Sequence, residues 1–101
     1  MEQEKMNVNI EAVHFDLRDE TRDFIDEKLS KVEFARELII ELEFHFVQEK
    51  KQYVLEVEVH FRWGSKHVIK VKAFDLHEGI NRLIDKLEQK VRKEKKKGKD
   101  H

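Results

Sequence analysis

The first third of the chain changes from a strand-like to a helix-like spacing of apolar residues. Over residues 6–12 every second residue is apolar, which predicts a half-buried strand. From Leu17 the apolar residues follow at intervals of three, four and seven, which predicts an amphipathic helix that runs to about Glu33. Asp16, with Asp19 three residues further on, is the expected N-terminal cap of this helix.

Three further segments alternate between apolar and polar residues and predict three more strands. Residues 38–46 and 53–61 are separated by a short polar loop, so we expect them to form a hairpin. Residues 67–73 follow a turn at Gly64 and Ser65 and keep their apolar side chains on one face. The chain therefore has four predicted strands.

The length of the second turn decides which side chains this last strand buries. A two-residue turn would place Val59 opposite Lys70 and bury the lysine. A three-residue loop or a bulge avoids this and leaves Lys70 and Lys72 on the polar sheet face, beside the face of Glu56 and Glu58. Because part of that face is acidic, we expect it to be a poor surface for RNA.

The last segment predicts a second helix of about 20 residues. It begins at Asp75, with Glu78 three residues later as a capping box, and its buried positions are Leu76, Ile80, Leu83, Ile84, Leu87 and Val91. The element order is then β-α-β-β-β-α. This order predicts an α+β fold, a two-layer sandwich in which both helices pack on one face of a four-stranded mixed sheet. The first two strands should be parallel neighbours and the others an antiparallel meander.

Composition limits the classes of protein to which the chain can belong. Its 101 residues fit one domain, expected at residues 6–97, followed by a basic, flexible tail at residues 98–101. There is no cysteine, no apolar signal core at the N-terminus and no stretch of about 20 apolar residues. We therefore expect a cytoplasmic protein that does not associate with a membrane.

The sequence offers little for catalysis or for a bound cofactor. The three glycines are too scattered to hold a nucleotide phosphate, and the six histidines show no metal-ligand spacing. We expect surface histidines, with a metal site of His45, His60 and Glu43 or Glu58 as the alternative. The expectation is a binding protein that is no enzyme and has no cofactor, metal or small-molecule substrate.

The net charge of −1 conceals an acidic body and a basic C-terminal helix. Residues 82–101 hold nine Lys or Arg against four Asp or Glu, whereas residues 1–81 hold twelve against eighteen. The basic residues of the helix recur at intervals of three and four. A solvated helix face that suits the helix dipole is one interpretation. A surface that contacts phosphates is the other, because this many cations exceed what the dipole requires.

Trp63 lies at the tip of the second hairpin and has two interpretations. Its indole can stack on a base or a protein surface, or it can cover the edge of the core. The sequence favours neither.

Two segments resemble a known family, the short ribosome hibernation promoting factors, which include protein Y and the ribosome-associated sigma-54 modulation proteins. The first comprises Asn9-Ile10, Arg22-Asp23-Phe24-Ile25 and Lys28-Leu29-Ser30-Lys31-Val32-Glu33. The second and more specific one comprises Asp75-Leu76-His77-Glu78-Gly79-Ile80-Asn81, Leu83-Ile84-Asp85-Lys86-Leu87 and Gln89-Lys90. The chain departs from the family pattern at Arg18, Thr21 and His77.

The resemblance implies a bacterial stress factor that binds 16S rRNA in the decoding region of the small ribosomal subunit (30S) and of the 70S ribosome. It would block mRNA and tRNA there, act as a monomer away from the ribosome, and lack the C-terminal dimerisation domain of longer relatives. The implied RNA contacts are Arg22, Lys28, Lys31, Arg82, Lys86, Lys90, Arg92 and Lys93. The alternative is a protein-interaction module that modulates a transcription factor such as sigma-54.

Overall fold

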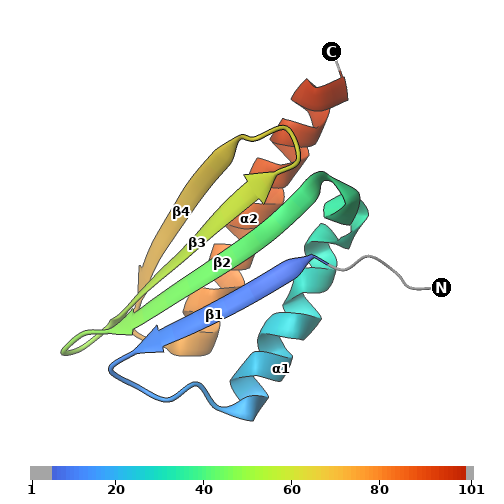
Figure 1. Cartoon of the computed structure of the whole chain (residues 1–101). Coiled ribbons are helices and arrows are strands. Elements are labelled where there is room, and N and C mark those ends of the chain that lie inside the picture. Colours follow the sequence, from blue (N-terminus) through green and yellow to red (C-terminus); the bar gives the residue numbers. More distant parts are fainter. Residues whose placement is uncertain (1–5, 100–101) are drawn as a thin grey trace.

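The fold is a four-stranded sheet with its helices on one face, as predicted (Figure 1). The computed structural model describes residues 6–99, and their side chains up to residue 96. The elements, in chain order, are β1 (Asn7–Val13), α1 (Asp19–Lys28), the 3-10 helix η1 (Leu29–Leu38), β2 (Ile39–Gln48), β3 (Tyr53–Phe61), β4 (Lys66–Ala73) and α2 (Leu76–Lys99).

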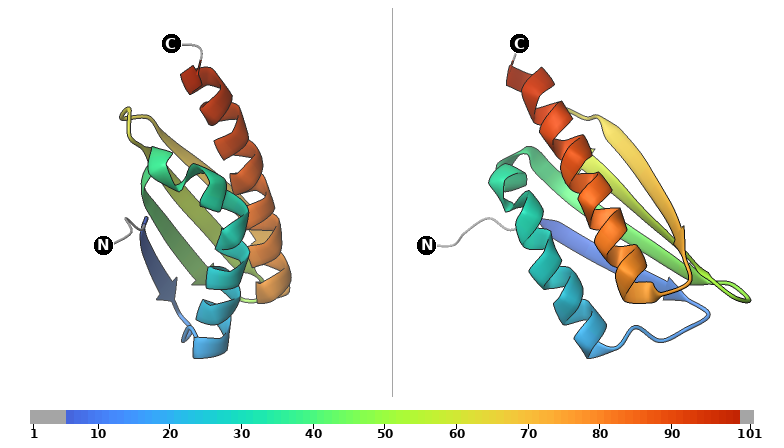
Figure 2. Two further views of the ribbon diagram at one scale, coloured as in Figure 1. Left: turned by 90° about the vertical axis from the view of Figure 1, so that its right-hand side faces the viewer. Right: turned by 180° about the vertical axis from the view of Figure 1, so that it is seen from behind.

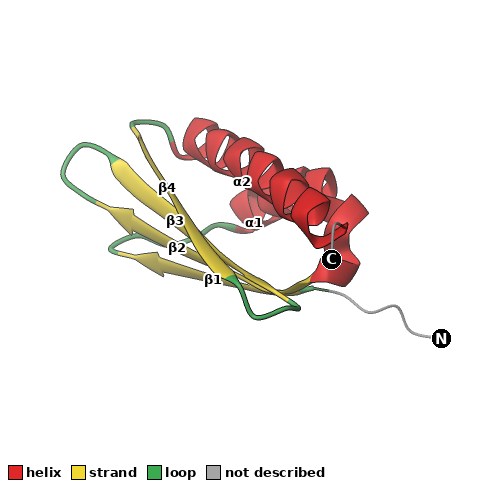
Figure 3. Cartoon of the chain, turned by 90° about the horizontal axis from the view of Figure 1, so that it is seen from above, coloured by secondary structure: helices red, strands yellow, loops and turns green. Residues whose placement is uncertain are grey.

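The sheet has the order β1-β2-β3-β4, with β1 parallel to β2 and the other pairs antiparallel. Figure 3 shows α1 and α2 in one layer above the sheet, while the opposite face of the sheet is uncovered. This arrangement follows from the alternation along each strand, because one face of the sheet must be covered by the apolar sides of the helices. The predicted mixed topology is confirmed.

The core lies between the two layers. Phe44, Phe46 and Phe61 of the sheet are at most 2% exposed, and the predicted apolar residues of α2 from Ile80 to Val91 are fully buried. Leu76 is only partly buried. The Glu78 backbone N–H donates to Asp75 Oδ2 over 2.9 Å, so Asp75 caps α2 as predicted.

The turn between β3 and β4 has the three-residue loop that the sequence requires. Phe61 donates its N–H to the Ser65 carbonyl over 2.9 Å, which leaves residues 62–64 as the loop, and Gly64 has the left-handed φ of 91°. Val57 consequently pairs with Ile69, and Lys70 lies opposite Glu56 on the uncovered face. Lys72, in contrast, lies opposite Val54 rather than a glutamate.

The first helix differs from the prediction at both ends. It begins at Asp19, and its N-cap residue Arg18 makes no side-chain capping bond. The Arg18 carbonyl accepts hydrogen bonds from the N–H groups of Thr21 and Arg22. Asp16 therefore does not cap it, because the helix begins three residues later. The α-helix also stops at Lys28 rather than near Glu33, and η1 continues. Leu29 and Val32 are buried and lie three positions apart, which suits the three residues per turn of a 3-10 helix. Ala35, with φ −118° and ψ 16°, is not helical and kinks η1.

No helix in the described part of the chain is long and apolar enough to cross a membrane.

Candidate nucleic-acid interface

The first helical segment, α1 with η1, lies side by side with α2 (Figure 2). Polar and aromatic side-chain contacts join the two. Near the start of both helices, Thr21 Oγ1 lies 3.0 Å from His77 Nε2, and the Phe24 ring stacks on the His77 ring at 4.4 Å. Further along, Lys31 Nζ donates to Asp85 Oδ1 over 2.5 Å. These contacts fix the cationic side chains of one helix relative to those of the other.

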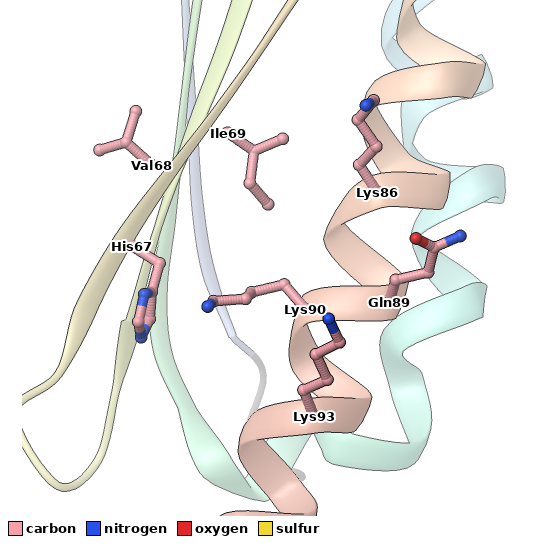
Figure 4. Close-up of a pocket in the computed structure, with 7 residues that line it drawn as sticks. All are labelled: His67, Val68, Ile69, Lys86, Gln89, Lys90 and Lys93. Carbon is pink, nitrogen blue, oxygen red and sulfur yellow. The ribbon is translucent and has the colours of Figure 1, made fainter.

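Three of the predicted contact residues line one groove. Lys86, Lys90 and Lys93 of α2 line a groove of 370 Å³ between this helix and the edge strand β4. The other lining residues are His67, Val68, Ile69 and Gln89. In Figure 4, Lys90 extends across the groove toward His67. We refer to the surface lined by these seven residues as the β4–α2 groove.

A buried glutamate supports this groove from within α2. Glu94 is 5% exposed, and its Oε2 lies 3.4 Å from His67 Nε2 and 3.9 Å from Lys90 Nζ. The carboxylate thus holds the imidazole on β4 and the ammonium on α2 at one end of the groove. Sequence reasoning did not assign a role to Glu94 or His67. The position of each was nevertheless detectable in the sequence. Glu94 follows Val91 by three positions on the buried side of α2, and His67 alternates in step with the apolar residues of β4 that face the helices.

Arg92 is part of a contact between α2 and η1. Its guanidinium donates two hydrogen bonds to Glu88 Oε2, over 3.2 and 3.0 Å, and lies 4.5 Å from the centroid of the Phe34 ring. Lys95 Nζ lies 5.1 Å from the same ring. The structure thus places Arg92 where it stabilises the helix pair, although its side chain remains 61% exposed.

The other four predicted residues differ in how firmly they are held. Arg82 donates to the Lys72 carbonyl over 2.7 Å, and hydrogen bonding and attraction to Asp85 raise the pKa of Lys31. Lys28 Nζ lies 5.4 Å from the Phe24 ring centroid, and Arg22 is exposed. Within residues 6–96, no carboxylate pairs with Arg22 or Lys28, nor with Lys86 or Lys93 of the groove.

The uncovered sheet face has the opposite charge. Glu43 on β2 lies directly opposite Glu58 on β3. Repulsion and a side-chain hydrogen bond from Glu41, with smaller effects of burial and Glu58, raise the pKa of Glu43, and Lys66 partly offsets this rise. Carboxylates in this arrangement repel phosphate, so the helical side of the molecule is the better candidate for binding a polyanion.

The histidines in the described part of the chain do not assemble a metal centre. Among the described residues, no three His, Asp or Glu side chains are placed so that they can hold a metal ion. His45 Nδ1 instead lies 3.0 Å from Glu11 Oε1 of the neighbouring strand. The alternative metal site of His45, His60 and Glu43 or Glu58 is therefore not formed.

Comparison with known proteins shows which family the chain resembles. Residues 8–99 match the family described as sigma 54 modulation protein / S30EA ribosomal protein. The chain is 30% identical to a ribosome hibernation promoting factor of Azotobacter vinelandii over 91% of this chain and 85% of that protein. It is 29% identical to a ribosome hibernation promoting factor of Klebsiella oxytoca over 95% of this chain and all of that protein.

Solved structures show the same fold. A ribosomal subunit interface protein from Coxiella burnetii has a TM-score of 0.79 at 21% identity, and the N-terminal domain of Thermus thermophilus protein Y has 0.75 at 20%. Each comparison covers 89% of this chain and 98% of the other. Since the family match spans nearly the whole chain, this protein belongs to the sigma 54 modulation protein / S30EA ribosomal protein family.

Proposed function

We propose that this protein is a ribosome hibernation factor that binds the small ribosomal subunit and inhibits translation. The observation that carries the proposal is the set of lysines in the β4–α2 groove, of which Lys86 and Lys93 have no carboxylate partner within residues 6–96. These cations are available for phosphate oxygens, which supply most of the affinity in nucleic-acid complexes. The relatives named above as ribosome hibernation promoting factors support the same function.

The arrangement suits recognition of a folded RNA by shape. The sheet orients two helices that are joined by non-covalent side-chain contacts. The cations of the two helices are therefore held in a fixed arrangement. Such a pattern suits recognition of the shape and phosphate backbone of a folded RNA rather than of its base sequence. The acidic sheet face directs the helical side toward the RNA.

The finer proposal concerns where and in what form the protein acts. We place it in the decoding region, in contact with 16S rRNA of the 30S subunit and the 70S ribosome, where it excludes mRNA and tRNA under stress. Arg22, Lys28, Lys31, Arg82 and Arg92 extend the contact surface beyond the groove lysines. The proposal includes a cytoplasmic monomer away from the ribosome, with residues 6–97 as one ribosome-binding unit.

Co-sedimentation with 30S subunits and 70S ribosomes tests the proposal. Wild type should pellet with both particles, and Lys86→Glu/Lys90→Glu/Lys93→Glu should lose most of that binding because three phosphate contacts become repulsive. The matched control is Lys50→Glu/Lys51→Glu/Lys70→Glu, which changes the net charge equally at exposed lysines outside the groove. The control should retain most of its binding.

Two outcomes would count against the proposal in different ways. Failure of the wild type to pellet with either particle would reject ribosome binding. Equal pelleting of all three proteins would retain ribosome binding and remove the β4–α2 groove from the contact surface.

The acidic sheet face favours a second candidate, a protein-interaction module that modulates a transcription factor such as sigma-54. Glu43 lies opposite Glu58 on that face, and repulsion from Glu41 raises the pKa of Glu43. The family description also includes sigma 54 modulation. A pull-down with purified sigma-54 distinguishes the two. Binding that Glu41→Gln/Glu43→Gln weakens and the triple groove variant does not would favour this second function.

A further inference from the structure

Trp63 is a large aromatic side chain that the fold leaves 45% exposed. It lies in the three-residue loop between β3 and β4. One face of its indole is covered by the fully buried Phe61, at a centroid distance of 5.0 Å and an interplanar angle of 5°. The nearly parallel stack leaves much of the indole open to solvent, which is a costly place for so much apolar surface.

The loop that carries Trp63 is held firmly by the backbone. Arg62 donates its N–H to the Leu38 carbonyl over 2.9 Å, and Gly64 donates to the Phe61 carbonyl over 3.0 Å. Gly64, with φ at 91°, adopts a left-handed backbone conformation that residues other than glycine rarely adopt. The indole is thus preorganised, so a partner that stacks on it loses little conformational entropy.

Trp63 is connected to the cationic groove through two aromatic contacts. The Phe61 ring, on which the indole stacks, also contacts the His67 ring edge to face at a centroid distance of 5.9 Å. His67 and Lys90 both line the groove. The indole therefore lies no more than about 11 Å from the His67 ring. An exposed aromatic ring at this distance from a groove lined by lysines suits unpaired nucleotides, with the base on the ring and the phosphates on the cations.

We infer that Trp63 stacks on an unpaired base of the RNA whose phosphates the β4–α2 groove binds. The inference rests on the proposed function and assigns a residue outside the predicted contact set. Unpaired bases are the parts of a folded RNA that can leave the helix and stack on a side chain. A protein surface would also accept an indole, but it gives no reason for the adjacent lysines.

Two substitutions of Trp63 separate stacking from simple apolar contact. Trp63→Phe keeps a π face over Phe61, whereas Trp63→Leu keeps apolar cover and removes that face. Stacking predicts that the Kd for 30S subunits rises about 5- to 100-fold in Trp63→Leu and clearly less in Trp63→Phe. Thermal denaturation establishes that both variants are folded before they are compared.

Phe74→Leu is the matched control, because Phe74 is 80% exposed at the opposite end of β4 and does not line the groove. It should bind 30S subunits as wild type does. An equal loss in Phe74→Leu and Trp63→Leu, or equal losses in Trp63→Leu and Trp63→Phe, would overturn the inference.

Ultraviolet cross-linking identifies the partner of the ring directly. After irradiation of the 30S complex and digestion with trypsin and nuclease, mass spectrometry should find a nucleotide on the peptide of residues 63–66. A ribosomal-protein peptide at that position instead would overturn the inference in favour of a protein contact. If Trp63→Leu binds as tightly as wild type, the inference fails while ribosome binding stands; if wild type itself does not bind, both fail.

Discussion

Lys31 on η1 and Asp85 on α2 form an ion pair between residues that are 54 positions apart in the sequence. The lysine Nζ and the carboxylate Oδ1 lie 2.5 Å apart, and both side chains remain partly exposed. The contact raises the pKa of Lys31 and binds to α2 a lysine that we propose as an RNA contact. Asp85 therefore both positions this cation and competes with phosphate for it.

Asp85→Asn should tighten binding to the ribosome. The substitution releases Lys31 and removes a negative charge from the helical side, whereas the loss of one surface ion pair costs little stability. We expect the Kd for 30S subunits to fall by about 1.5- to 5-fold in a sedimentation titration. Asp26→Asn, at an exposed position of α1 with no lysine partner in the described chain, controls for the charge change alone. An equal effect of both variants would show that Lys31 gains nothing from its release.

The Phe34 ring should stabilise the end of the helix pair through Arg92 and Lys95. Phe34→Leu keeps an apolar side chain on η1 but removes the ring on which both cations lie. Cation–π contacts at exposed sites contribute about 0.5 to 1 kcal/mol, so the Tm should fall by about 2 to 8 °C. Phe74→Leu, which removes an exposed ring with no cation over it in the described residues, should leave the Tm nearly unchanged. Similar Tm values for wild type and Phe34→Leu would contradict this account.

Glu43→Gln should stabilise the protein at neutral pH. Because Glu41 raises the pKa of Glu43 above its ordinary value of 4.5, the folded state binds this proton more tightly than the unfolded state. Stability is therefore lost as pH rises from about 4.5 through the raised pKa, and the penalty persists at pH 7. The Tm of Glu43→Gln should exceed that of wild type at pH 7, and the difference should vanish below pH 4.5.

The control for this charge effect is Glu49→Gln in the exposed β2–β3 loop. At pH 7 it should leave the Tm nearly unchanged. A Tm advantage of Glu43→Gln that stays constant down to pH 4 would show that charge repulsion is not its cause.

Gly79→Ala should destabilise the protein although alanine favours helices. A Cβ atom at residue 79 would lie 2.6 Å from Leu55 Cδ1 and 2.9 Å from Ala73 Cβ, both in the packed layer between α2 and the sheet. Overpacking of this kind costs about 1 to 3 kcal/mol, against about 1 kcal/mol gained in helix propensity. Urea denaturation should show a lower free energy of unfolding for Gly79→Ala. The difference between Gln89→Ala and Gln89→Gly, at an exposed position of the same helix, measures the propensity gain alone. A stabilised Gly79→Ala would contradict the packing argument.

The sheet was predictable from the sequence because each strand residue faces one of only two sides, and the alternation is visible over a few neighbouring residues. Alternation assigned the four strands, and the cost of burying Lys70 excluded a two-residue turn before the register was known. The end of the first helix was not predictable in the same way. Over the few residues from Leu29 to Ala35, intervals of three and of 3.6 positions give similar patterns, so periodicity did not separate a 3-10 helix from an α-helix.

The candidate site was predicted only in part, for a different physical reason. The spacing of Lys86, Lys90 and Lys93 places them on one side of α2 without any tertiary information. Whether a cation is available to a ligand depends on tertiary partners, as the distant Lys31–Asp85 pair shows. The buried position of Glu94 was readable from its spacing, but its charge argued for the surface.

We propose that the groove lysines bind phosphates of ribosomal RNA, and the salt dependence of 30S binding measures these contacts. Each neutralised phosphate contributes about 0.7 to 0.9 to the slope of log affinity against log salt concentration. The slope of Lys86→Gln/Lys90→Gln/Lys93→Gln should therefore be shallower than that of wild type by about 2 to 3. Identical slopes for the two proteins, with wild type bound, would contradict the claim.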